Sequence, residues 1–228
     1  MDFVGLEKLS LVDYDNKLSC VLFMQGCNFR CPFCHNSQLV LNDNVVIPFK
    51  DIMDYLKLRR NVLDGVVISG GEPTLMPDLI DKIKEIKALG YLVKLDTNGT
   101  NPDVVQKLID LKLVDHFAMD IKNYIDDYEP ITGVKNIYKD RVLKTISILI
   151  NSGVSYEFRT TLVKEFHNEN NIKKMGEMLK GAKKMYLQHF VDNKDCIVHN
   201  LHDISIQEAT NYKQILSNYI DFVELRGY

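Results

Sequence analysis

Apolar segments recur along this chain, and each is followed by a segment with the periodicity of an amphipathic helix. The apolar segments cover residues 18–26, 64–69, 91–95, 114–119, 155–163 and 184–191. The helical segments cover residues 48–60, 77–89, 102–111, 138–151, 169–180 and 205–219. Strands that alternate with helices in this way predict βαβ units, and therefore an α/β fold with parallel strands.

The remaining segments are short. Residues 1–16 are predicted to be a lead-in, 123–137 and 192–204 to be polar loops, and 221–225 to be a terminal strand. No Gly/Ser/Pro-rich linker and no internal repeat divides the chain, which predicts one domain over residues 1–228. Periodicity alone does not distinguish an open doubly wound sheet from a barrel.

Composition excludes several classes of protein. The 228 residues are 46% hydrophobic and 26% charged, as in an ordinary globular protein. A formal charge of −3 gives no basic excess for nucleic acid. No apolar run approaches the ~20 residues of a membrane helix, and the first residues lack the basic and apolar regions of a signal peptide. We therefore expect a cytoplasmic protein without nucleic-acid or membrane partners.

The segment 27–36 carries three cysteines, Cys27, Cys31 and Cys34, separated by three and then two residues. Because Pro32 lies inside it, the segment is expected to be a loop. Thiolates in such a loop can hold an iron–sulfur cubane, which normally takes four cysteines. With three, one iron remains open to another ligand, as in a catalytic metal site.

Other interpretations of the cysteines are weaker. A structural zinc site needs a fourth ligand, and His35 directly follows Cys34. Cys20 is expected to be a small buried hydrophobe and Cys196 a free thiol. Disulfides are not expected in a chain with five cysteines and no secretory signal.

Polar motifs follow the predicted strands at the point where each strand ends. They are the cysteine loop, Gly70-Gly71-Glu72, Asp96-Thr97-Asn98, Asp120-Ile121-Lys122, Arg159 and Gln188-His189. Parallel α/β folds place active sites at the carboxyl ends of their strands. The segments are therefore predicted to meet at one mouth.

The same motifs carry a resemblance to a known family. The cysteine spacing, Gly70-Gly71-Glu72-Pro73, Asp96-Thr97-Asn98-Gly99 and Met119-Asp120-Ile121-Lys122 occur in the order typical of radical S-adenosylmethionine (SAM) enzymes. The chain resembles the activating enzymes of glycyl radical enzymes along nearly its whole length. It is most similar to the activating proteins of anaerobic ribonucleoside-triphosphate reductase, with pyruvate formate-lyase activating enzyme as a more distant relative.

The resemblance implies a partial (β/α)6 TIM-type barrel, open on one side, around a radical SAM core. It implies a [4Fe–4S] cluster on Cys27, Cys31 and Cys34, with SAM on the fourth iron. Further cofactor-binding residues are implied by position, namely Phe33, Gly70, Gly71, Glu72, Asp96, Asn98, Asp120, Lys122 and Arg159. A monovalent cation at Asp96, Thr97 and Asp120 is also implied.

Some of these residues have simpler explanations. The glycines allow close approach of the backbone to a ligand, but also suit a strand-to-helix turn. Asp120 and Lys122 alternate along a strand end and point the same way, to bind SAM or to pair with each other. A buried Arg159 needs a partner, which is a SAM carboxylate, Glu157 or Glu72.

The expected activity is reductive cleavage of SAM to a 5′-deoxyadenosyl radical, which then generates a glycyl radical on a partner enzyme. Flavodoxin or ferredoxin is the expected electron donor, and loop 123–137 a candidate partner contact. Alternatives are another glycyl radical enzyme as partner, a small-molecule substrate such as a nucleotide precursor, an iron–sulfur electron carrier, or a zinc-stabilised binding protein. The sequence leaves open the oligomeric state and the roles of Cys20, Cys196, His189, His199 and His202.

Overall fold

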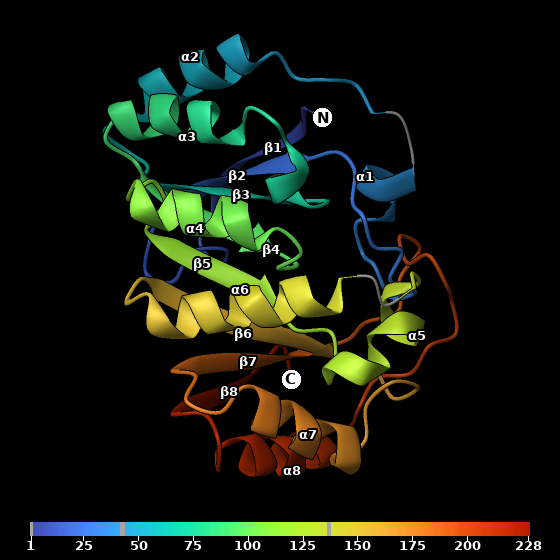
Figure 1. Ribbon diagram of the computed structural model, residues 1–228. Coiled ribbons are helices and arrows are strands. Elements are labelled where there is room, and N and C mark those ends of the chain that lie inside the picture. Colours follow the sequence, from blue (N-terminus) through green and yellow to red (C-terminus); the bar gives the residue numbers. More distant parts are fainter. Residues whose placement is uncertain (1, 42–43, 136–137) are drawn as a thin grey trace.

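The computed structural model describes residues 2–41, 44–135 and 138–228. One eight-stranded sheet runs through it in chain order from β1 to β8 (Figure 1). β1 pairs with β2 antiparallel, and every later neighbouring pair is parallel. The strands are β1 Phe3–Ser10, β2 Ser19–Met24, β3 Gly65–Gly70, β4 Leu92–Thr97, β5 His116–Asp120, β6 Ser155–Leu162, β7 Lys184–His189 and β8 Phe222–Arg226.

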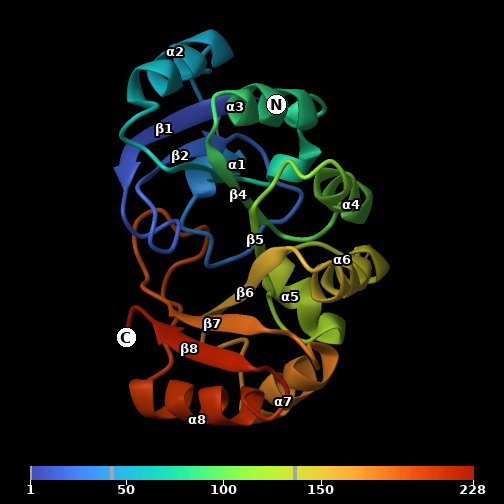
Figure 2. The same ribbon diagram turned by 90° about the vertical axis from the view of Figure 1, so that its left-hand side faces the viewer.

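Helices connect the parallel strands and cover the outer face of the sheet, which bends into an arc (Figure 2). They are α1 Ser37–Leu41, α2 Phe49–Arg59, α3 Leu79–Ala88, α4 Pro102–Asp110, α5 Tyr128–Thr132, α6 Lys139–Asn151, α7 Glu169–Met178 and α8 Ile206–Leu216. Short 3-10 turns lie at Pro73–Leu75 and Ile125–Asp127. Six strands, β2 to β7, are each followed by a helix, and β1 and β8 are the edges, so the predicted partial (β/α)6 barrel is confirmed. Within the described ranges no helix has the length and apolarity to cross a bilayer.

Two predicted segments hold more regular structure than expected. The lead-in 1–16 contains β1, whose alternation is interrupted at Gly5 by a register shift against β2. The polar loop 123–137 contains α5, which ends at Gly133 with a left-handed φ of 67°. Residues 1, 136 and 137 of these two segments lie outside the described residues. The short terminal strand expected near 221–225 is confirmed as β8.

The two faces of the sheet carry different side chains, because successive residues of a strand point to opposite sides. Outward residues such as Leu22, Val66 and Ile68 pack with the helices into the main core. Inward residues form a small apolar cluster of Tyr14, Val21 and Val67 near β2 and β3. Further round the arc the inward positions are polar or charged, which gives the barrel an interior suited to charged ligands.

Candidate active site

A cavity of about 260 Å³ opens at the carboxyl ends of the strands. It is lined by three cysteines, a run of polar strand-end residues and two aromatic rings of the cysteine loop. Its lining includes Cys27, Phe29, Cys31, Phe33, Cys34, His35, Asn36, Ser69, Gly70, Gly71, Asp96, Thr97, Asn98, Asp120, Lys122, Arg159, Thr161 and Gln188. The predicted convergence of strand-end motifs on one mouth is therefore observed.

Strand register explains why the charged residues meet. Asp120 at the end of β5 lies directly opposite Arg159 of β6. In parallel strands, opposed residues point to the same face. Asp96 of β4 lies opposite Ala118, two residues before Asp120, and so faces the same interior. A short inward side chain at Ala118 leaves room for Arg159 to reach both carboxylates.

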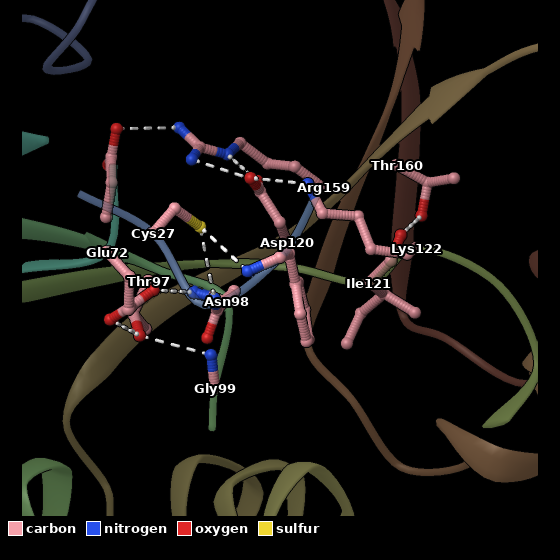
Figure 3. Close-up of polar contacts among 12 residues, drawn as sticks. Cys27, Glu72, Thr97, Asn98, Gly99, Asp120, Ile121, Lys122, Arg159 and Thr160 are labelled. Carbon is pink, nitrogen blue, oxygen red and sulfur yellow. Dashed lines mark hydrogen bonds and ion pairs between the residues drawn. The ribbon is translucent and has the colours of Figure 1, made fainter. Parts of the chain in front are cut away.

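Arg159 bridges the two carboxylates. Its Nη1 lies 3.3 Å from Asp96 Oδ2, and its Nη2 lies 3.0 Å from Asp120 Oδ1. Figure 3 shows the Asp120 carboxylate between Arg159 and Lys122, whose Nζ is 3.0 Å from Asp120 Oδ2. Burial opposes the charge of Asp120, but the two cations lower its pKa overall. The alternatives Glu157 and Glu72 are thus not the direct partners of the Arg159 guanidinium in the bridge.

Asp96 keeps one carboxylate oxygen without a partner. Its Oδ2 accepts a hydrogen bond from Ser69 Oγ at 2.8 Å and faces Arg159. Its Oδ1 is buried and has no hydrogen-bond donor among the described residues. A buried acceptor without a donor costs stability unless a ligand or ion supplies one. The cavity therefore presents an acceptor for a hydrogen-bond donor or a cation.

Lys122 is held from three sides. Its Nζ lies 5.9 Å from the centre of the Phe33 ring, its backbone N–H donates to Tyr128 Oη at 3.1 Å, and its carbonyl contacts His167 Nε2 at 3.0 Å. Burial opposes the ammonium charge, but Asp120 raises the pKa of Lys122 overall. The lysine is therefore charged and fixed beside the cysteines.

His167 lies in the loop between β6 and α7, yet its side chain belongs to the interior of the protein. The side chain is only 3% exposed. Val163 N–H donates to Nδ1 at 3.0 Å, so Nε2 carries the proton and donates to the Lys122 carbonyl. Burial lowers the pKa of His167, which keeps this tautomer neutral. A polar loop sequence gave no sign of this, because the contact joins residues 45 apart.

Gly70 and Gly71 are required by packing against the start of the cysteine loop. A Cβ on Gly71 would lie 1.9 Å from the Gly26 carbonyl oxygen, and one on Gly70 would lie 2.4 Å from Met24 N. Gly71 N–H donates to Met24 O at 2.9 Å, and Glu72 N–H to Gly26 O at 2.8 Å. The glycines therefore anchor the cysteine loop as well as lining the cavity.

A Gly71→Ala substitution is expected to lower the free energy of unfolding by about 2–3 kcal/mol, because the new methyl group overpacks a backbone contact. It should also reduce iron bound after reconstitution, since Gly26 directly precedes Cys27. Urea denaturation and iron analysis measure both effects. Gly153→Ala is the control, because Gly153 has a left-handed φ of 74° with nothing near its Cβ position. Equal iron content in the two variants would contradict this role of Gly71.

Glu72 was expected to bind the cofactor, but its carboxylate is turned away from the cavity and is fully buried. Oε1 accepts from Thr74 N at 3.0 Å and from Thr97 Oγ1 at 2.8 Å, and Oε2 accepts from Asn98 N at 2.6 Å. Burial raises the pKa of Glu72, and these hydrogen bonds oppose the shift. The side chain thus ties the end of β3 to the end of β4 (Figure 3).

In the cavity wall, Cys31 is buried, and Cys27 and Cys34 are half-buried. Burial raises the pKa of Cys27 to about 11 and that of Cys31 to about 12, and it also raises that of Cys34. Lys122 is the nearby positive charge that opposes the rise for all three. Metal binding at these residues must therefore release protons, and the ammonium helps to hold the resulting thiolates.

Two distant segments hold the cysteine loop in place. Arg30 N–H donates to Thr132 O of α5 at 2.7 Å, and Val198 N–H donates to Pro32 O at 2.9 Å. His35 stacks on Phe190, and its Nε2 lies 2.9 Å from Val191 O. The loop is thus braced by the two segments that the sequence predicted to be polar loops.

The residues left without a role are now placed. Cys20 is fully buried in β2, and Cys196 is a buried free thiol in the segment after β7. His189 pairs with Asp203 at 3.0 Å. His199 and His202 are exposed and lie beside Asp192 and Glu165 respectively.

Sequence reasoning missed several residues of the site. Ser69 and Thr161 line the cavity from strand ends. Each lies two residues after an inward-pointing residue of its strand, and this alternation could have identified them. Asn28 and Thr100 join Asn98 beside Cys27, and no local pattern connects residues so far apart.

Comparison with known proteins decides what this arrangement is. The Radical SAM superfamily model matches residues 21–179, the segment that carries every strand-end motif up to Arg159. The chain belongs to the radical SAM superfamily. A radical SAM methyltransferase from Sphaerobacter thermophilus shares the fold, with a TM-score of 0.73 at 14% identity over 96% of this chain and 69% of that one.

Two relatives of this radical SAM enzyme are similar over most of their length. A protein of Methanocaldococcus jannaschii named as a glycyl-radical enzyme activating enzyme is 33% identical over 97% of this chain and 94% of its own. The pyruvate formate-lyase-activating enzyme of Clostridium pasteurianum is 30% identical over 78% of this chain and 76% of its own.

Radical SAM membership implies a [4Fe–4S] cluster and SAM, and the residues present fit both. Three thiols line one cavity, as soft ligands for iron. Within the described ranges no three His, Cys, Asp or Glu side chains converge on a single ion. Each thiolate of a cubane binds a different iron, so its ligands stand further apart than those of one ion. The unpartnered Asp96 Oδ1 and the cavity-lining backbone of Gly70 and Gly71 suit the ammonium of an amino acid.

Proposed function

We propose that this radical SAM enzyme generates a glycyl radical on a partner enzyme, and that the partner is anaerobic ribonucleoside-triphosphate reductase. One observation carries the proposal. The similarity to an activating enzyme extends over 97% of the chain, so it includes the segment after β7, beyond the matched radical SAM core, that braces the cysteine loop through Val198.

Different residues around the cavity are proposed to bind the cluster and the separate parts of SAM. Cys27, Cys31 and Cys34 hold the cluster. The Gly70–Gly71 backbone and Asp96 Oδ1 orient the amino-acid end of SAM, and Asp120 and Lys122 face the ribose. When bound and reduced by one electron, the cluster and SAM supply a 5′-deoxyadenosyl radical, which is the cofactors' own chemistry.

Arg159 has two roles in this proposal. It neutralises Asp96 and Asp120, and with Lys122 it brings the four side-chain charges to a balance. A SAM carboxylate entering the cavity then meets the remaining N–H groups of a fixed guanidinium. The aromatic ring of Phe33, which is 5% exposed, shields the cluster side of Lys122 from water.

A monovalent cation at Asp96, Thr97 and Asp120 remains part of the proposal. Asp96 Oδ1 supports it, because hard cations prefer oxygen ligands. The Thr97 hydroxyl already donates to Glu72, and Arg159 already supplies a positive charge. We therefore expect the cation to bind only together with SAM, which would bring a further carboxylate.

The partner is proposed to dock at the mouth formed by the cysteine loop and α5. Its glycine would reach the cavity beside Gln188 and Asn36, at the carboxyl edge of the sheet. Flavodoxin or ferredoxin is the proposed electron donor. The segment 123–135 reaches the cysteine loop through the contact of Thr132 with Arg30, and its exposed residues are proposed to meet the partner, namely Asp126, Glu129, Pro130, Gly133 and Lys135.

The experiment is glycyl radical formation on purified candidates. The protein, reconstituted with iron and sulfide without oxygen and reduced, is mixed with SAM and either the reductase or the formate-lyase encoded in the same genome. We expect the glycyl radical doublet by electron paramagnetic resonance on the reductase. A signal only on the formate-lyase would change the proposed partner and would still support glycyl radical formation. No signal on either, with SAM still cleaved, would overturn glycyl activation.

A further inference from the structure

Three side chains form a closed set of hydrogen bonds beside Cys27. Asn98 Nδ2 donates to Asn28 Oδ1 at 2.8 Å, and Asn28 Nδ2 donates to Thr100 Oγ1 at 2.9 Å. The Thr100 hydroxyl in turn donates to Asn98 Oδ1 at 2.8 Å. Asn98 is 6% exposed and Thr100 is fully buried. We call these residues the Asn28–Asn98–Thr100 network.

The network fixes which way the Asn98 amide points. Asn98 Oδ1 accepts from both Thr100 N at 3.0 Å and Thr100 Oγ1. Its oxygen therefore faces Thr100, and its NH₂ group faces the cysteine loop. That nitrogen lies 3.9 Å from Cys27 Sγ, the contact drawn in Figure 3. The backbone N–H of Phe29 lies 3.4 Å from the same sulfur.

The backbone of Asn98 is held by a residue that follows the neighbouring strand, β3. Its backbone N–H donates to the buried Glu72 carboxylate at 2.6 Å. The amide is thus fixed through both its backbone and its side-chain oxygen, and little freedom remains for it to turn toward a ligand in the cavity. Asn98 also lines the cavity, and the SAM contact that the resemblance implies for it stays a prediction.

We propose that the Asn28–Asn98–Thr100 network is a positioning device that aims an N–H donor at the Cys27 sulfur and so sets the reduction potential of the bound cluster. The inference rests on the proposed function, because it requires the cluster. Hydrogen bonds to cluster sulfurs stabilise the more electron-rich, reduced state and raise the potential. Removing the donor makes the cluster harder to reduce.

The test is a redox titration of the reconstituted protein, followed by electron paramagnetic resonance. Asn98→Ala removes the donor, and Thr100→Val breaks the network while keeping the side-chain shape. Thr100→Ser restores the hydroxyl. Thr145→Val is the matched control, because Thr145 Oγ1 donates to Gly99 O at 2.7 Å under the same loop without reaching Cys27. SAM affinity is measured on each variant by equilibrium dialysis.

Asn98→Ala and Thr100→Val are expected to shift the reduction equilibrium about tenfold toward the oxidised cluster, or about 59 mV for one electron. Thr100→Ser and Thr145→Val should keep the wild-type potential, and Thr100→Val, at a fully buried residue outside the cavity lining, should keep the SAM affinity. An unchanged potential in a fully loaded Thr100→Val protein would overturn the inference, as would a loss of SAM affinity in Asn98→Ala at an unchanged potential. A wild-type protein that binds no cluster would instead contradict the proposed function.

Discussion

Replacing Arg159 with Met is expected to lower the free energy of unfolding by about 3 kcal/mol at pH 7, because it leaves two carboxylates deep in the barrel without their cation. The Asp96 and Asp120 side chains are 16% and 32% exposed, and Arg159 is the cation that contacts both. Lys122 compensates only Asp120. Asp120 keeps some contact with solvent. The expected loss of stability therefore lies at the lower end of the range for removing one partner of a buried ion pair.

The loss of stability in Arg159→Met should become smaller in acid. In the native protein, the neighbouring cations lower the pKa of Asp120 below its ordinary value of 3.8. A lowered pKa contributes stability above the unfolded pKa, and the contribution is lost as pH falls through the native pKa. The variant lacks the main cause of this shift, so the stabilities of wild type and variant converge as Asp120 takes up a proton.

Urea denaturation at pH 7 and at pH 3.5 measures this effect. Lys144→Met is the control, because Lys144 pairs with Asp103 at the surface and its loss should leave stability near the wild-type value. SAM binding should also fall in Arg159→Met and not in the control. A variant as stable as wild type at pH 7 would contradict the account of the charge bridge.

The second large effect is expected at the other end of the barrel interior. Glu157 of β6 is 1% exposed and lies 3.4 Å from Lys94 Nζ, 3.5 Å from His116 Nε2 and 3.6 Å from Arg226 Nη1. Burial opposes its charge, but the hydrogen bond from His116 and the charge of Lys94 lower the pKa of Glu157 from 4.5 to about 2. Its ionised form is therefore part of the folded state.

Glu157→Gln is expected to cost about 3 kcal/mol at pH 7, the linkage value of such a pKa difference. Because the pKa is lowered, the wild-type advantage is complete above pH 4.5 and disappears as pH falls toward 2. Urea denaturation curves of wild type and Glu157→Gln, recorded between pH 2 and pH 7, measure how the difference in their stability changes with pH. Lys94→Met in the Glu157→Gln background should recover part of the loss, since both buried charges are then gone. A difference that does not change with pH would contradict the charge explanation.

The residue pattern predicted the parallel α/β fold and the place of the site, and the family resemblance added the partial barrel. Alternating apolar and amphipathic segments predict β2 to β7 and their helices, because these signals lie within one element. The strand ends predict a common mouth, since parallel strands share a direction. Which charged residues pair inside that mouth was not predicted, and the structure joins Arg159 to Asp96 and Asp120.

What the sequence did not predict depends on contacts between distant segments. β1 is a strand only because β2 offers an edge, and its alternation is broken by a register shift at Gly5. The positions of Glu72 and His167 follow from how neighbouring strand ends and loops pack. The partners of Arg159 stayed open because they lie on other strands, far away in the sequence, and only strand register brings them opposite its side chain.

The most direct test of the central claim is reductive cleavage of SAM. The protein is reconstituted with iron and sulfide without oxygen, reduced with dithionite and supplied with SAM, and 5′-deoxyadenosine is measured against a Cys31→Ala control. We predict that 5′-deoxyadenosine forms with the intact cysteines and not in the control. A protein that holds a cluster, yet neither binds nor cleaves SAM, would contradict the account and favour an iron–sulfur electron carrier.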